Sequence, residues 1–305
     1  MKALITGSLG FVGTYLRKEL EQNGYDVTGL DIRPGDRTIQ ADLLNGQQIA
    51  DLVAAEKPDV IFHLAGQADV GRSWKIPQTT IEVNVIASIN LMEAVRAYNP
   101  EVRMVLVGSS DQYGNLEAAG VNVSEELEMR PQSPYAVSKR AQEEMAKLYV
   151  RSYGMNICMT RSFNHGGAGQ RTGFMIPDFA SGIVKVERAE QEALSVGNLE
   201  SRRDFTHVKD VVRAYRLIAE KGHTGEVYNV GSGNAYSAQE VLDLLRSMAK
   251  CPVAVRQDPA RMRPSDTPVI CCNHEKLTEH TGWEPQHTLE EIVRETLEFY
   301  RTKEA

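Results

Sequence analysis

The chain has 305 residues, of which 42% are hydrophobic and 25% are charged. These proportions are typical of a globular protein with a full hydrophobic core and argue against a disordered chain. Because Asp and Glu outnumber Lys and Arg by 41 to 34, the formal net charge is −7. This balance argues against a general nucleic-acid binder, which needs a cationic surface.

The cysteines and histidines indicate neither a disulfide framework nor a metal site. The four cysteines include no C-x-x-C pair, and the seven histidines show no metal-ligand spacing. No apolar run approaches the roughly 18 residues of a membrane-spanning helix. The first strand is expected at residue 2, which leaves no room for a signal peptide. We therefore expect a cytoplasmic protein with reduced thiols, no metal and no membrane contact.

Short apolar runs alternate with amphipathic stretches over the first 164 residues. The runs predict strands at 2–6, 25–31, 59–64, 102–108 and 157–161. The amphipathic stretches predict helices at 10–23, 47–56, 78–98 and 134–153, the last with Ser133 as its N-cap and Gly154 after its end. This alternation predicts an α/β fold, a doubly wound parallel sheet covered by helices on both faces.

The pattern changes after about residue 165, where short strands, Gly and Pro separate isolated helices. Helices are predicted at 209–221, 238–249 and 289–301, and a strand at 226–230 that could return to the main sheet. We expect residues 1–164, with 205–231 returning, to form a nucleotide-binding domain. We expect 165–204 and 232–305 to form mainly a smaller C-terminal lobe for the substrate.

Three glycines stand between the first strand and the first helix, in TGSLGFVG. Glycine permits a tight turn and a close backbone approach to a pyrophosphate, which the free N–H groups of the helix N-terminus then bind. The spacing is G-x-x-G-x-x-G in a strand–turn–helix setting, which predicts a Rossmann-type dinucleotide site. Its expected contacts are Gly7, Gly10, Phe11, Val12 and Gly13.

Asp31 closes the second strand, where a carboxylate binds the adenosine ribose of a dinucleotide. A carboxylate there repels the 2′-phosphate of NADP and so favours NAD, although Arg33 could offset the repulsion and leaves NADP open. We expect Asp42 and Leu43 beside the adenine, with a solvated loop aspartate as the alternative for Asp42. The segment that ends the third strand carries small residues that let the cofactor pass closely, and its expected contacts are Leu64, Ala65 and Gly66.

Tyr135 and Lys139 are four residues apart on a predicted helix and therefore share one face. A phenol is a poor acid at neutral pH, but an ammonium about 4 Å away favours the phenolate form. We therefore expect Lys139 to bring the pKa of Tyr135 toward neutrality, so that the tyrosine exchanges a proton with a sugar oxygen. Ser109, at the end of the fourth strand, is expected to hold that oxygen.

These motifs resemble those of the extended short-chain dehydrogenases/reductases that act on nucleotide sugars. The segments SFNH (162–165), VGNLESRRDFT (196–206), QDPARMRPS (257–265) and TGWEP (281–285) are most similar to GDP-4-keto-6-deoxy-D-mannose reductases, which make GDP-D-rhamnose. They are also similar to GDP-mannose 4,6-dehydratases. The resemblance implies NAD(P)H-dependent reduction of a GDP-hexose, with hydride passing to C4 and Tyr135 as the proton donor.

Positions 109 to 111 bear on the choice between reductase and dehydratase. Dehydratases resemble the pattern Thr–(Asp/Ser)–Glu, whereas this chain has Ser109, Ser110 and Asp111. The shorter acid weakens elimination chemistry, so a reductase is favoured, and a dehydratase or an NAD-dependent 4-epimerase stays open. Asp31 suits a tightly held NAD better than a dissociable NADPH. From another class, a redox-sensing module that binds NAD(P) without turnover is disfavoured by the Ser109, Tyr135 and Lys139 set.

A nucleoside diphosphate needs cations and an amide nearby. Arg203 and Arg263 are the candidates for the pyrophosphate, because arginine forms bidentate hydrogen bonds, with surface ion pairs as the alternative. Asp266 resembles the ribose-binding acid of the family and Asn164 its diphosphate-contacting amide, with a turn cap as the alternative for Asn164. We expect structural roles for the three histidines nearest these motifs, His63, His165 and His207.

The predicted helix 78–98 has apolar residues on more than one face. One face would cover the sheet, and a second apolar face is typical of a protein interface. Related enzymes pair such helices into a four-helix bundle, which implies a homodimer. The alternative is that the second lobe covers this face.

Overall fold

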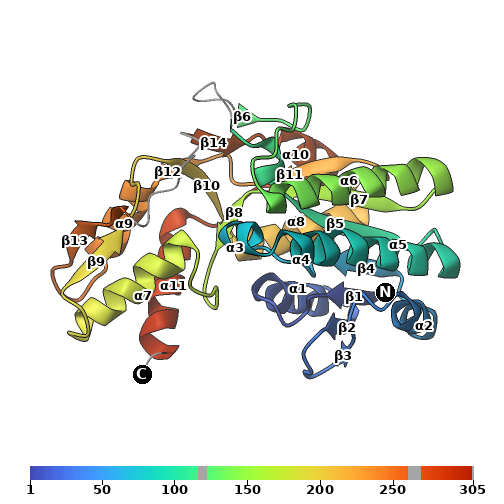
Figure 1. Ribbon diagram of the computed structural model, residues 1–305, viewed down its shortest axis with the longest axis horizontal. Coiled ribbons are helices and arrows are strands. Elements are labelled where there is room, and N and C mark those ends of the chain that lie inside the picture. Colours follow the sequence, from blue (N-terminus) through green and yellow to red (C-terminus); the bar gives the residue numbers. More distant parts are fainter. Residues whose placement is uncertain (116–121, 260–268, 304–305) are drawn as a thin grey trace.

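The computed structural model describes residues 1–115, 122–259 and 269–303. Seven parallel strands form the main sheet, in the order β11-β7-β5-β4-β1-β2-β3 (Figure 1). They are β1 (Lys2–Thr6), β2 (Asp26–Asp31), β3 (Thr38–Gln40), β4 (Val60–His63), β5 (Arg103–Ser109), β7 (Ile157–Ser162) and β11 (Val227–Val230). The chain starts at β1, moves out to β3 and returns to β4 on the other side of β1. The ends of β1 and β4 therefore flank the crevice where such sheets bind ligands.

Helices cover both faces of this sheet, as the prediction of a doubly wound fold requires. Successive strand residues point to opposite faces, so Leu4 and Ile5 enter different hydrophobic cores. The core with Leu4 is covered by α2 (Gly46–Glu56), α5 (Ala87–Tyr98) and α6 (Pro134–Tyr153). The core with Ile5 is covered by α1 (Phe11–Gln22), α8 (Val208–Lys221) and α10 (Glu275–Thr281). The fold class is confirmed.

A third hydrophobic core lies beside the main sheet (Figure 1). It is built from α7 (Met175–Glu187), α9 (Ala238–Ser247) and α11 (Leu289–Lys303), with the parallel pair β9 (Ala193–Val196) and β13 (Ala254–Gln257). Between this core and the main sheet runs a small sheet of β6 (Asn122–Val123), β8 (Asn164–Gly166), β10 (Arg202–His207), β12 (Ala235–Ser237) and β14 (Val269–Cys272). The strand β11 pairs with β7, so the chain returns to the main sheet after β10.

The predicted helix 78–98 contains an irregular turn. It is divided into α4 (Pro77–Ile81), a π-helical turn (Glu82–Ile86) and α5. The π turn turns the side chain of Asn84 into the molecule, where it is fully buried. Several elements had no prediction, among them the helices α7 and α10 and the short elements β3 and α3 (Val70–Lys75), whose few residues show no clear periodicity.

Over the described ranges, none of the helices is both long and apolar enough to cross a membrane. The four cysteines, all within those ranges, are free thiols. Within the same ranges, no group of three or more His, Cys, Asp and Glu side chains could hold a metal ion.

Candidate active site

The glycine loop between β1 and α1 is shaped by close backbone packing. Gly7 has a φ of 71°, and a Cβ on it would lie 2.9 Å from the backbone of Ala65. A Cβ on Gly13 would lie 2.4 Å from the carbonyl oxygen of Gly7. Side chains at these positions would push the loop away from β4 and from the start of α1. The loop thus fits the cradle that a dinucleotide pyrophosphate requires.

Asp31 and Arg33 lie together beside this loop. The buried Asp31 carboxylate accepts the N–H of Leu9 at 3.1 Å, the N–H of Arg33 at 3.1 Å and Arg33 Nε at 3.2 Å. Arg33 Nη2 also donates to the carbonyl oxygen of Leu9 at 2.9 Å. The charge that would repel a 2′-phosphate is therefore paired with a guanidinium, most of which is exposed to solvent.

The other predicted cofactor contacts lie in different environments. Asp42 is exposed and accepts the N–H of Leu44 at 2.9 Å. Leu43 is buried in the core under α2. Phe11, the first residue of α1, stacks its ring on His165 at a centroid distance of 6.4 Å, while Val12 packs against the core on that face. Ala65 donates its N–H to Thr6 Oγ1 at 3.2 Å and ties the Leu64–Gly66 segment to the end of β1.

Tyr135 and Lys139 lie on one face of α6, as predicted, and both are buried. Ser133 caps the helix by accepting the N–H of Ala136 at 3.1 Å, and Pro134 occupies its first position. Ser109, which ends β5, lies near the hydroxyl of Tyr135 and lowers the pKa of that phenol in part. The three side chains of the predicted catalytic set thus meet at the carboxyl end of the sheet.

The pKa of Tyr135 is the point at which the prediction fails. Burial raises this pKa, the charge of Asp111 raises it further, and Ser109 lowers it in part. Lys139 directs its ammonium at the carbonyl oxygen of Val107, 2.9 Å away, and at Gln142 Oε1, 3.0 Å away. The prediction that Lys139 brings the phenol toward neutrality is therefore wrong for this structure, because burial and the charge of Asp111 both raise the pKa of Tyr135. Tyr135 retains its proton at neutral pH.

Burial also lowers the pKa of Lys139 to about 8. Taking an ammonium out of water disfavours its charged form, and the two neutral oxygens that it contacts compensate only in part. Lys139 therefore changes charge near physiological pH.

Two buried amides that contact the site had not been singled out from the sequence. Asn84 donates to the carbonyl oxygen of Gln67 at 3.1 Å and to Ser138 Oγ at 2.8 Å, which connects the loop after β4 to α6. Gln142 contacts Lys139 directly. A polar residue within an apolar helix pattern, as in IEVNVI, was the available signal for Asn84.

The predicted substrate contacts are only partly visible. Asn164 begins β8, which pairs with β10, so Asn164 and Arg203 belong to the same small sheet. Arg203 is half-buried and donates to the carbonyl oxygen of Arg202 at 2.8 Å. Ser110 is buried in the turn Ser110–Tyr113 that follows β5. Arg263 and Asp266 lie outside the described residues.

The three histidines have structural contacts, as predicted. His63 is fully buried, and burial together with the charge of Lys139 lowers its pKa to about 3. His165 Nδ1 lies 3.0 Å from the carbonyl oxygen of Phe163. His207 caps α8 by accepting the N–H of Lys209 at 3.1 Å.

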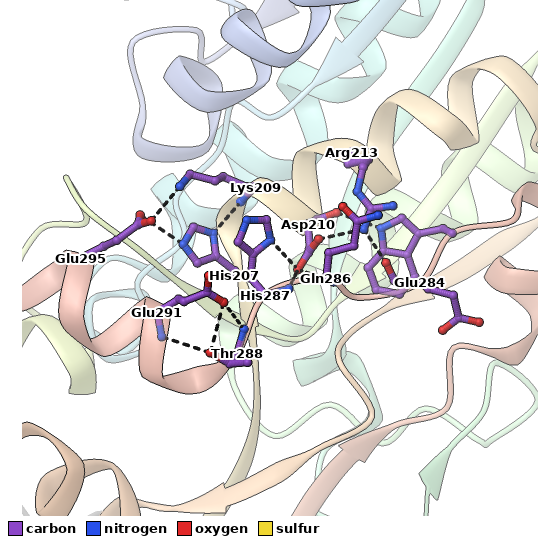
Figure 2. Close-up of polar contacts among 11 residues, drawn as sticks. His207, Lys209, Asp210, Arg213, Glu284, Gln286, His287, Thr288, Glu291 and Glu295 are labelled. Atoms are coloured by element: carbon purple, nitrogen blue, oxygen red, sulfur yellow. Dashed lines mark hydrogen bonds and ion pairs between the residues drawn. The ribbon is translucent and has the colours of Figure 1, made fainter.

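A polar cluster connects α8 with α11, and we name it the α8–α11 joint (Figure 2). His207 Nε2 lies 3.2 Å from Glu295 Oε2, and Lys209 Nζ donates to Glu295 Oε1 at 2.7 Å. Because α8 packs on the main sheet and α11 belongs to the third core, the joint fastens the two parts together. Its members are His207, Lys209, Asp210, Arg213, Gln286, His287 and Glu295.

Asp210 is the centre of this joint and is fully buried. It accepts Arg213 Nη2 at 2.8 Å and the backbone N–H groups of Gln286 and His287 at 3.0 and 2.9 Å. Burial acts to raise the pKa of Asp210, but these donors outweigh it and the net pKa is lowered. The carboxylate therefore holds the segment that leads into α11.

Comparisons with known proteins agree with this geometry. Residues 4–296 match the family model "GDP-mannose 4,6 dehydratase". The chain is 33% identical over 303 residues to the GDP-6-deoxy-D-mannose reductase of Pseudomonas aeruginosa, covering 99% of this chain and 98% of that protein. Among solved structures it is similar to RMD from Pseudomonas aeruginosa complexed with NADPH, with a TM-score of 0.90, 32% identity and 99% coverage of both chains. It is also similar to UDP-glucose 4-epimerase from Thermus thermophilus complexed with NAD, with a TM-score of 0.88, 28% identity and 99% coverage of both chains.

Proposed function

Because the chain belongs to the GDP-mannose 4,6-dehydratase family of NAD(P)-dependent extended short-chain dehydrogenases/reductases, we propose that it reduces the 4-keto group of GDP-4-keto-6-deoxy-D-mannose. The product is GDP-D-rhamnose. The relative from Pseudomonas aeruginosa, which is a reductase by name, supports this choice at 33% identity over the full length. The short acid Asp111, in place of the glutamate expected for elimination, supports it as well.

The residues present fit a nicotinamide dinucleotide. The glycine loop would hold its pyrophosphate, and Asp31 would bind its adenosine ribose. When bound in its reduced form, the nicotinamide supplies the hydride that C4 needs. Asn164 and Arg203 would bind the diphosphate of the sugar nucleotide, with Arg263 and Asp266 as further contacts.

Tyr135 and Ser109 carry the proton chemistry of the proposed reaction. Ser109 donates a hydrogen bond to the C4 oxygen, and Tyr135 gives its proton to that oxygen as the carbonyl becomes an alcohol. The observation that supports this role best is the buried Tyr135 hydroxyl near Ser109, with a pKa raised by burial. A phenol that keeps its proton at neutral pH suits a donor, and the ammonium of Lys139 stabilises the phenolate left behind.

We also propose that NADH is favoured over NADPH, and that the preference is small. Asp31 disfavours a 2′-phosphate, but Arg33 pairs with it at 3.2 Å and has an exposed side chain that can meet a phosphate. Asp31→Asn should raise the ratio of kcat/KM for NADPH to kcat/KM for NADH. An unchanged ratio would remove Asp31 from cofactor selection.

A homodimer through α4, the π turn and α6 is proposed as well. Ile81, Ile86, Val137 and Leu148 on these helices are exposed. Among the described residues, the elements of the third core and of the small sheet leave these side chains exposed, which favours a partner. Sedimentation of the protein and of Ile86→Asp should give a dimer and a weaker dimer, whereas a monomeric protein would contradict the proposal.

The deciding experiment supplies the keto sugar with NADH or with NADPH and follows the absorbance of the reduced nicotinamide. Consumption of the reduced cofactor with formation of GDP-D-rhamnose supports the reductase. Conversion of GDP-mannose alone to a 4-keto-6-deoxy product would identify a dehydratase instead. Inertness to both, with tight dinucleotide binding, would favour a redox-sensing module.

A further inference from the structure

The ammonium of Lys139 is held by two neutral oxygens. One is the carbonyl oxygen of Val107 on β5, at 2.9 Å, and the other is Gln142 Oε1, three residues along α6, at 3.0 Å. Gln142 is 1% exposed. The ammonium also faces the Leu64–Gly66 segment after β4, which we call the cofactor loop, since a Cβ on Gly66 would lie 3.7 Å from Lys139 Nζ. Gln142 is thus the single side chain among the described residues that accepts a hydrogen bond from Lys139.

The orientation of the Gln142 amide is determined by its neighbours. Its Nε2 donates to Ser88 Oγ at 2.7 Å, and the hydroxyl of Ser88 donates to the carbonyl oxygen of Asn84 at 2.8 Å. Because the one hydroxyl proton of Ser88 is used, Ser88 Oγ acts toward the amide only as an acceptor. The oxygen of Gln142 must then point at Lys139, since the opposite orientation would set donor against donor.

The same chain of hydrogen bonds continues through His63 on β4 to Thr6 on β1. His63 Nε2 lies 2.8 Å from Ser88 Oγ and therefore carries the proton of the neutral ring. His63 Nδ1 accepts the hydroxyl of Thr6 at 2.7 Å, and Thr6 Oγ1 in turn accepts the N–H of Ala65 at 3.2 Å. We name these side chains, Thr6, His63, Ser88 and Gln142, the Thr6–Gln142 chain. It ends at Lys139. At its other end Thr6 accepts the N–H of Ala65, whose backbone packs against Gly7.

The Thr6–Gln142 chain is uncharged. Its one titratable member, His63 on β4, is neutral at physiological pH because burial lowers its pKa to about 3. The adjacent carboxylate on α6, Glu143, faces away and pairs with Arg161 at 2.7 Å. The other ionisable groups at the site include Tyr135 on α6, Asp111 on the turn after β5 and Tyr215 on α8.

We propose that Gln142 is the positioning residue for Lys139: its amide oxygen, oriented through Ser88, His63 and Thr6, fixes the ammonium beside the cofactor loop and stabilises its charge. The proposal rests on the proposed function, because it assumes that Tyr135 and Lys139 act at the reacting centre. It assigns Gln142 no contact with substrate. The prediction is that the protonation of Lys139 follows the chemistry of position 142.

Two nearly isosteric variants test this directly. Gln142→Leu removes the acceptor and should lower the pKa of Lys139, whereas Gln142→Glu adds a carboxylate and should raise it, each by roughly one unit. NMR titration of Lys139 in protein labelled at the lysine side chains reads this pKa without substrate or turnover. A lowered pKa of Lys139 in Gln142→Leu together with a raised pKa in Gln142→Glu supports the proposal. An unchanged pKa, or the same shift in both variants, overturns it.

Two controls complete the experiment. Glu144→Gln on the exposed face of α6 changes the charge of the same helix and should leave the titration of Lys139 unchanged. His63→Asn keeps an uncharged donor and acceptor within the chain and should move the titration less than Gln142→Leu. If Gln142→Leu does not fold, Gln142→Glu against Glu144→Gln still decides, because a pKa of Lys139 that fails to rise in Gln142→Glu overturns the proposal.

The pH dependence of kcat/KM adds a readout that a purely structural role would not move. Where charged Lys139 is required, the loss of activity at alkaline pH should begin at lower pH in Gln142→Leu and at higher pH in Gln142→Glu. Failure of the wild-type protein to reduce the keto sugar would refute the proposed function alone. The NMR titration then still decides on the positioning of Lys139.

Discussion

Two buried polar regions of this molecule satisfy their groups in opposite ways. The Thr6–Gln142 chain uses hydroxyls, an amide and a neutral imidazole, and its hydrogen bonds end on one ammonium. The α8–α11 joint uses opposite charges, with Asp210 against Arg213 and Glu295 against Lys209 (Figure 2). The difference shows what each region does. The Thr6–Gln142 chain fixes a single ammonium with uncharged groups, while the joint uses ionic contacts to hold two hydrophobic cores together.

This contrast has an energetic reason. A buried charge is costly unless it is paired and hydrogen-bonded, and breaking such a pair destabilises a protein by about 3–5 kcal/mol. A neutral hydrogen bond contributes about 1 kcal/mol. The joint should therefore be sensitive to loss of a single partner, whereas the Thr6–Gln142 chain should matter more for the position and charge of Lys139 than for stability.

The largest expected effect is the fall in kcat when the Tyr135 hydroxyl is removed. Tyr135→Phe removes the proton donor and should lower kcat by about 10²- to 10⁴-fold, with the dissociation constant of the dinucleotide nearly unchanged. Steady-state kinetics and calorimetry measure the two quantities. Tyr153→Phe, at an exposed position of the same helix, is the control. Unchanged turnover in Tyr135→Phe would remove the tyrosine from the proposed chemistry.

The next largest effect is the loss of stability when the α8–α11 joint loses its central carboxylate, Asp210. Asp210→Ala leaves the donors of Arg213, Gln286 and His287 without their buried acceptor and should lower the free energy of unfolding by about 3–5 kcal/mol. Urea unfolding measures it. Asp243→Ala removes an exposed carboxylate that pairs with Arg246 and should cost no more than about 0.5 kcal/mol. Equal costs for the two variants would mean that Asp210 is not the centre of the joint.

Acid pH should lower the stability of the folded protein through His63. Its folded-state pKa of about 3 lies below the ordinary value of 6.5, so the unfolded chain binds the proton first. Stability from neutral His63 is present above about pH 6.5 and is lost as the pH falls toward 3, by roughly 3 kcal/mol at about pH 4. In urea unfolding, the free energy of unfolding of His63→Asn should therefore fall by roughly 3 kcal/mol less than that of the wild type between about pH 6.5 and pH 4. Parallel curves for the variant and the wild type would contradict a neutral buried His63.

The smallest effect concerns the exposed edge of the joint. Lys209 is partly exposed where it pairs with Glu295, so Lys209→Met should lower the free energy of unfolding by only about 0.5 kcal/mol. Because salt screens exposed pairs, the difference should shrink at high ionic strength. Thermal unfolding at low and high salt measures it. A cost above that of Asp210→Ala would reverse the assignment of centre and edge.

Local patterns in the sequence were sufficient for much of the fold and for the central site. The run KALIT predicted β1 to the residue, and Ser133-Pro134 with Gly154 bounded α6, because these signals depend on neighbouring residues. The spacing of Tyr135 and Lys139 placed both side chains on one face for the same reason.

What escaped prediction depends on contacts between distant segments. Thr6, His63, Ser88 and Gln142 come from four elements, and no local pattern links them. Asp210 likewise meets backbone groups about 76 residues later in the chain. The pKa of Tyr135 was misjudged for a related reason: spacing places Lys139 on the same helix face, but it reveals neither the burial nor the Asp111 charge that raise this pKa.

The return of the chain to the main sheet at β11 has a consequence for biosynthesis. The strand β7 has β11 as its outer partner, and the core on one face of the sheet includes α8. A nascent polypeptide released only as far as residue 164 would expose a bare strand edge and an uncovered apolar layer, both of which promote aggregation. The ribosome must therefore deliver the chain beyond residue 230 before the seven-stranded sheet is complete, so its maturation is tied to translation of segments encoded much later.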